Sequence, residues 1–121
     1  MLVVKDSSPK DLEYIKEKFN LEFSHDYTVP EIFFTIFEES DIIGYSRIII
    51  KDNKPYLADL IVEGDYGFYD MDFFLKATAS KVLDLGFEYL YFNYIEKLEK
   101  ILINSPAYIP DLLKGNCSKN V

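Results

Sequence analysis

The feature that most constrains this fold is a long amphipathic helix predicted between two apolar strands. Residues 56–63 and 87–92 are short apolar runs of the kind that form strands. Between them, side chains of a predicted buried stripe recur at helical spacing, and Gly86 follows in a position typical of a helix end. The stripe consists of Met71, Phe74, Leu75, Thr78, Val82 and Leu85. A strand–helix–strand connection of this kind predicts one parallel pair of strands within a sheet.

Two further strands are predicted before this unit. Residues 32–38 and 42–51 are rich in apolar, aromatic and β-branched side chains, and short polar turns bound them. Short turns join antiparallel neighbours, so these runs and residues 56–63 predict an antiparallel meander.

The two ends of the chain differ in how clearly they can be interpreted. Residues 2–5 predict an opening strand, and Ser8 with Asp11 predicts the capping box of a first helix. A last helix is predicted after Asn93, whereas residues 104–121 are too short and irregular to assign. The order β-α-β-β-β-α-β-α predicts one α/β domain over residues 1–121, with a mixed, mostly antiparallel sheet, one parallel strand pair and flanking helices.

The charge of the chain limits its partners. The net charge is −8, from 13 basic and 21 acidic residues. Nucleic acids and anionic membranes bind basic surfaces, so neither is predicted as a partner, whereas a small cationic amine or a basic protein segment fits this charge. A single cysteine, Cys117, and the lack of a signal-like or membrane-length apolar run lead us to expect a cytoplasmic protein.

Several local patterns accompany the predicted order of elements. Residues 41–46 (DIIGYS) carry a glycine–aromatic–small step, and residues 57–62 (LADLIV) form the strand before the long helix. Leu75 and Gly86 lie within and after that helix, and Asn93 follows the fifth strand. Together these patterns resemble the GNAT superfamily of acyl-CoA-dependent N-acetyltransferases. The resemblance implies a GNAT-like fold and acetyl transfer from acetyl-CoA to a primary amine.

The resemblance also implies roles for particular residues. The thioester would lie between the fourth and fifth strands, with its carbonyl polarised by a backbone N–H near Ile61 or Val62. Asp59, or Glu63 on the same strand face, would be the general base, and Tyr94 is the nearest phenol to the family's general acid. A solvated carboxylate on a sheet face is the simpler interpretation of Asp59. Asn93 would lie at the cofactor.

The family's coenzyme A signature, Arg/Gln-x-x-Gly-x-Gly/Ala, is altered in this chain. Counting without gaps from Val62 places Gly67 at the basic position, and Asp70 and Asp72 at the two glycines. A shift of three residues recovers only Gly64 and Gly67, whose backbone could close on the pyrophosphate. Tyr69 then stands where a small residue belongs, and there is still no basic residue. Acetyl-CoA is therefore the cofactor that the resemblance implies, and the altered signature argues against its classical binding.

The carboxylates of residues 63–72, between the predicted strand 56–63 and the long helix, lead to two hypotheses. We expect Asp70 or Asp72 to cap the long helix and to occupy the place of the pyrophosphate. A cation site formed by Glu63, Asp65, Asp70 and Asp72 is an alternative, but their spacing matches no known metal loop, so no metal is predicted. The chain is then either an acetyltransferase or a degenerate, non-catalytic binding module that has lost coenzyme A. An open edge strand could also pair in a homodimer.

Overall fold

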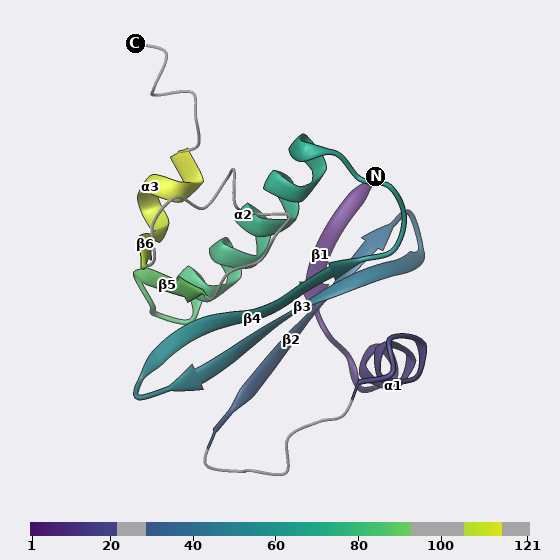
Figure 1. The fold of residues 1–121 in the computed structure, drawn as a ribbon, viewed down its shortest axis with the longest axis horizontal. Coiled ribbons are helices and arrows are strands. Elements are labelled where there is room, and N and C mark those ends of the chain that lie inside the picture. Colours follow the sequence, from purple (N-terminus) through teal and green to yellow (C-terminus); the bar gives the residue numbers. More distant parts are fainter. Residues whose placement is uncertain (22–28, 93–105, 115–121) are drawn as a thin grey trace.

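The computed structural model describes residues 1–21, 29–92 and 106–114. Its elements, in chain order, are β1 (Leu2–Asp6), α1 (Pro9–Lys18), β2 (Glu31–Glu38), β3 (Asp41–Lys51), β4 (Lys54–Val62), α2 (Phe68–Asp84), β5 (Tyr89–Phe92), β6 (Ala107–Tyr108) and α3 (Ile109–Lys114). The strands form one sheet in the order β1-β2-β3-β4-β5-β6, and α1 lies well apart from α2 and α3 (Figure 1). No helix in these ranges is long and apolar enough to cross a membrane.

The strand pairing confirms the predicted sheet. Strands β1 to β4 pair antiparallel with their neighbours, β4 pairs with β5 in parallel, and β5 pairs antiparallel with β6. Strand β6 was not predicted, because two residues are too few to show an alternating pattern. The helix predicted after Asn93 lies outside the described residues, whereas α3 follows β6 and packs against α2.

The first helix begins as its sequence predicts. The Ser8 hydroxyl accepts a hydrogen bond from the Asp11 N–H at 3.1 Å, and the Ser8 N–H donates to the Asp11 carboxylate at 3.0 Å. Both bonds of the capping box are therefore present, and they satisfy N–H groups that the helix itself leaves without partners.

The end of α2 explains why β5 starts later than predicted. Gly86 adopts a φ of 102°, and its N–H donates to the Leu83 carbonyl at 2.9 Å, while the Phe87 N–H donates to the Val82 carbonyl at 3.4 Å. These are the two bonds of a Schellman motif. Because Phe87 closes the helix, the strand begins at Tyr89 rather than at residue 87.

The predicted start of α2 is wrong. The helix begins at Phe68 with Gly67 as N-cap, and no side chain hydrogen-bonds to the cap. Asp70 already lies in the first turn, where the helix dipole stabilises a carboxylate. Asp72 forms an ion pair with Lys76 at 2.7 Å. Neither aspartate caps the helix, because both lie inside it.

The two faces of the sheet are covered by different helices. On β3, Ser46 hydrogen-bonds to Thr78 of α2 at 2.9 Å, whereas the ring of its neighbour Tyr45 contacts Phe19, directly after α1, at 5.2 Å between centroids. Successive strand residues point to opposite faces, so α2 and α1 lie on opposite sides. The main core lies on the α2 side and is fully or nearly buried: Phe34, Ile36, Ile48, Leu57, Leu60, Met71, Phe74, Leu75, Ala79, Val82, Leu90 and Ile109.

We predict that Gly44→Ala destabilises the fold. A Cβ at Gly44 would lie 2.2 Å from the Ile61 carbonyl oxygen, so β3 and β4 would have to separate. We expect a loss of about 2 kcal/mol in the free energy of unfolding, measured by chemical denaturation. Gly67→Ala is the matched control, because a Cβ there meets nothing within 4 Å. An equal loss in both variants would contradict the prediction.

Candidate functional site

The candidate site lies along β4, on the face that α1 covers. The β3–β4 register changes between Arg47, opposite Asp59, and Ile48, opposite Leu57, so Ala58 is the extra residue of a β-bulge. The parallel pairing with β5 covers only two described positions, Tyr56 with Tyr91 and Leu57 with Phe92. Asp59 therefore follows directly after the bulge, beyond the described parallel pairing.

Two side chains of β3 hold the Asp59 carboxylate. Arg47 Nε lies 2.8 Å from Asp59 Oδ2, and the Tyr45 hydroxyl donates to the same oxygen at 3.4 Å. Arg47 also reaches Glu31, with Nη1 at 3.9 Å from the carboxylate. The Asp59 and Arg47 side chains are only 22% and 20% exposed, so their charges are largely removed from water. Within the described part of the chain, buried Arg47 Nε makes no aligned hydrogen bond, and its short contact with Asp59 is an ion pair.

Burial changes the acidity of Tyr45. Desolvation of the phenol, with the neighbouring Asp59 charge as the next cause, raises the pKa of Tyr45 to about 12. Tyr45 therefore keeps its proton at neutral pH and remains a hydrogen-bond donor to Asp59.

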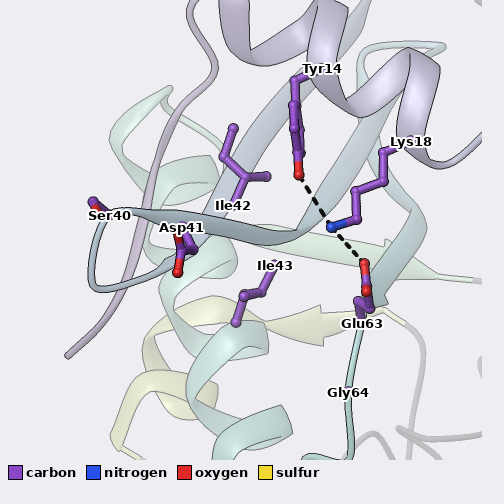
Figure 2. A pocket seen from close by; sticks show the side chains of 8 residues that line it. All are labelled: Tyr14, Lys18, Ser40, Asp41, Ile42, Ile43, Glu63 and Gly64. Atoms are coloured by element: carbon purple, nitrogen blue, oxygen red, sulfur yellow. Dashed lines mark hydrogen bonds and ion pairs between the residues drawn. The ribbon is translucent and has the colours of Figure 1, made fainter.

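Glu63, the second predicted base, lies in a different environment. It follows the end of β4, and its Oε2 lies 2.7 Å from Lys18 Nζ of α1 (Figure 2). Lys18 also donates to the Tyr14 hydroxyl at 3.2 Å, and the hydrogen bond to Glu63, followed by that to Tyr14, raises the pKa of Lys18. The structure places Asp59 and Glu63 on the same face but not together, since four strand residues span about 13 Å.

A pocket of about 520 Å³ surrounds the Lys18–Glu63 pair (Figure 2). We name it the α1 pocket, and its lining residues are Tyr14, Lys18, Ser40, Asp41, Ile42, Ile43, Glu63 and Gly64. It joins the end of α1, the start of β3 and the end of β4, three segments far apart in the sequence.

Four of the predicted cofactor-binding residues are described, and they lie at the end of β4 and in the segment that leads to α2. Ile61 and Val62 end β4, Gly64 adopts a φ of 109°, and Gly67 caps α2 with open space around its Cα. Residues 93 and 94, which include the predicted Asn93 and Tyr94, lie outside the described residues.

The carboxylates of residues 63–72 do not converge. Glu63 pairs with Lys18, whereas Asp72 pairs with Lys76. Tyr66 donates to Glu38 at 2.7 Å, and this hydrogen bond is the main cause that raises the pKa of Tyr66 to about 12. Throughout the described ranges, no group of three or more His, Cys, Asp or Glu side chains is arranged to hold a metal ion.

The partners of both candidate bases, Arg47 and Lys18, were not predicted from the sequence. Arg47 offered a signal, because it is a charge in the middle of an apolar strand, but only the bulged register shows that it faces Asp59. Lys18 offered none, since its contact with Glu63 depends on how α1 packs on the sheet.

We predict that Asp59→Asn lowers the pKa of Tyr45 from about 12, because the Asp59 charge is one of the causes that raise it. The folded pKa lies above the unfolded value near 10, so this contribution to stability is present below pH 10 and is lost as the pH rises through 12. Titration of ¹³C-labelled tyrosines by NMR would measure the shift, with Tyr45→Phe assigning the resonance. An unchanged Tyr45 pKa would contradict this account.

The same variant tests the ion pair. We expect Asp59→Asn to lower the free energy of unfolding by about 2 kcal/mol, between the values for exposed and buried pairs. Asp65→Asn makes the same chemical change at an exposed loop position and is the control.

Comparisons with known proteins show the fold. No protein-family model matches the chain, and no curated protein matches it. Similar solved structures include the aminoglycoside acetyltransferase meta-AAC0020 from an uncultured soil metagenomic sample, in complex with trehalose: TM-score 0.52, 17% identity, 78% of each chain covered. The same enzyme in complex with sisomicin gives a TM-score of 0.53 at 16% identity, covering 82% of this chain and 81% of that one. The chain therefore shares the fold of these acetyltransferases.

Proposed function

We propose that this protein transfers an acetyl group from acetyl-CoA to a primary amine of a small cationic molecule or a basic protein segment. One observation carries the proposal: in an acetyltransferase-like fold, the largely buried Asp59 carboxylate lies on β4, just beyond the described parallel pairing with β5. A carboxylate held in place beside a reacting amine is suited to accept its proton.

In the proposed reaction, the amine nitrogen attacks the thioester carbonyl carbon. The C–N bond forms, the C–S bond breaks, and the proton of the amine passes to Asp59, directly or through a water molecule. Arg47 and Tyr45 both contact Oδ2, so among the described residues Oδ1 is left for the proton. The thiolate leaves and takes up a proton, for which Tyr94 stays the proposed donor.

Strand geometry favours Val62 over Ile61 as the donor to the thioester oxygen. The Glu63 N–H donates to the Ile43 carbonyl on β3 at 2.7 Å. N–H groups alternate in direction along a strand, so the N–H of Val62 points away from β3, toward the side of β5.

The start of α2 supports a phosphate site. Gly67 provides no side-chain acceptor at the N-cap, so the first-turn N–H groups of α2 are available to an anion. This position favours the shifted register, in which Gly67 takes the first glycine position of the coenzyme A signature and Gly64 takes the basic position.

The second candidate function is a non-catalytic binding module. The sequence around the start of α2 favours this function. Residues 63–72 contain no Lys or Arg to bind a phosphate, and the Asp70 carboxylate lies in the first turn of α2. Tyr69, at the small-residue position of the shifted signature, is 84% exposed. This hypothesis expects no acetyl-CoA binding.

Calorimetric titration of acetyl-CoA at low and moderate salt decides between the two functions. If acetyl-CoA binds at the start of α2, Gly67→Asp will weaken its binding about tenfold or more, because a carboxylate will cap the helix and repel phosphate. Gly67→Ser caps the helix without a charge, so we expect it to weaken binding less. Thermal melting should show that neither variant is destabilised. Wild-type protein that binds no acetyl-CoA would favour the non-catalytic module.

Acetylation assays test the base. We expect Asp59→Asn to lower kcat/KM by about 100-fold or more while acetyl-CoA affinity stays the same. The amine screen should include sisomicin, because similar structures are aminoglycoside acetyltransferases and one was solved with it. Full activity of Asp59→Asn would exclude Asp59 as the base.

A further inference from the structure

The α1 pocket holds an ammonium group of the protein itself. At one end of the pocket, Lys18 Nζ lies 2.7 Å from the Glu63 carboxylate and 3.2 Å from the Tyr14 hydroxyl (Figure 2). Nζ also lies 5.4 Å from the centroid of the Tyr14 ring, but its contact is with the hydroxyl end, so the ring face adds little. Glu63 and Tyr14 thus form a site whose acceptors suit an ammonium group.

The opposite end of the pocket carries a second carboxylate. Asp41 lies there with Ser40, and Ile42 and Ile43 lie between this end and the Lys18–Glu63 pair in the view of Figure 2. Within residues 1–21, 29–92 and 106–114, Asp41 has no ion pair or side-chain hydrogen bond, and its backbone is fixed by pairing with Glu38 in the β2–β3 hairpin. The pocket therefore has two acidic ends separated by an apolar stretch.

The charges of the pocket favour cations over anions. Two carboxylates face one lysine, and the whole chain has a net charge of −8. An anion entering the pocket would meet both Asp41 and Glu63, whereas a cation would be attracted from a distance by the field of the protein.

Lys18 can be replaced by an incoming cation at small cost. The Lys18 and Glu63 side chains are 31% and 58% exposed, and ion pairs at such exposure contribute little to stability. The lysine ammonium stands on a flexible four-carbon stem and is strongly hydrated once it is released.

We propose that the α1 pocket binds an aliphatic diamine or polyamine, with one ammonium replacing Lys18 at Glu63 and Tyr14, and the other at Asp41. The alkyl chain between the ammonium groups passes Ile42 and Ile43, whose side chains point to opposite sides of β3 (Figure 2). The volume of about 520 Å³ is within the range of small-molecule sites. This binding does not depend on acetyl transfer, so it is tested without acetyl-CoA and stands or fails separately from the proposed activity.

The test is calorimetric titration of the whole chain with 1,4-diaminobutane and spermidine, at about 20 mM salt to limit screening. Butylamine, with a single ammonium, is the comparison ligand. We expect saturable binding of the diamine and weaker binding of butylamine, because only the diamine reaches both carboxylates.

Four variants locate the site. Lys18→Met removes the competing ammonium and is expected to tighten diamine binding about five- to tenfold. Glu63→Gln and Asp41→Asn are each expected to weaken it by a similar factor. Lys10→Met makes the same charge change as Lys18→Met on an exposed part of α1 and is expected to alter the affinity less than about twofold.

The opposite results would overturn the proposal. Equal effects of Lys18→Met and Lys10→Met would show diffuse attraction to an acidic protein rather than a site. Absence of saturable binding to both the wild type and Lys18→Met, at diamine concentrations up to about 5 mM, would exclude the site. Circular dichroism of every variant would establish that each is folded as the wild type.

Discussion

The close approach of β3 and β4 at Gly44 is the constraint on which the candidate site depends. Only a glycine fits there, because the Ile61 carbonyl occupies the place of a side chain. From this point the two strands run in register until the bulge at Ala58, which brings Arg47 opposite Asp59. A shift of one residue would turn Asp59 to the other face and into the apolar core.

The bulge at Ala58 also determines which β4 side chains point into the core and which point to the candidate site. Leu57 and Leu60 are three residues apart, so in a regular strand they would point to opposite faces. Both are buried on the α2 side, at 0% and 4% exposure, because the extra residue Ala58 restores the alternation. The same irregularity lets β4 fill the core on one face while it presents Asp59 and Glu63 on the other.

The arrangement of charges answers the question raised by the acidic loop after β4. In the sequence its carboxylates form a cluster, but in the structure they separate. Glu63 turns to Lys18 of α1, and Asp72 turns along its own helix to Lys76. Neither occupies the N-cap of α2, which Gly67 leaves without a side-chain acceptor. The interpretation that these carboxylates fill a phosphate site by capping the helix therefore fails, and Asp70 in the first turn is the one that would still oppose a phosphate there.

The sequence by itself determined the features that depend on neighbouring residues: the capping box at Ser8, the Gly86 helix end, the hairpins and the order of elements that requires a parallel pair. These features follow from local hydrogen bonds and hydrophobic spacing, which a linear pattern records. Only the tertiary structure decided the start of α2, the pairing of Asp59 with Arg47 and Tyr45, and the α1 pocket around Lys18 and Glu63. These depend on a bulged register and on the packing of α1 against the sheet, which bring together residues that no local pattern links.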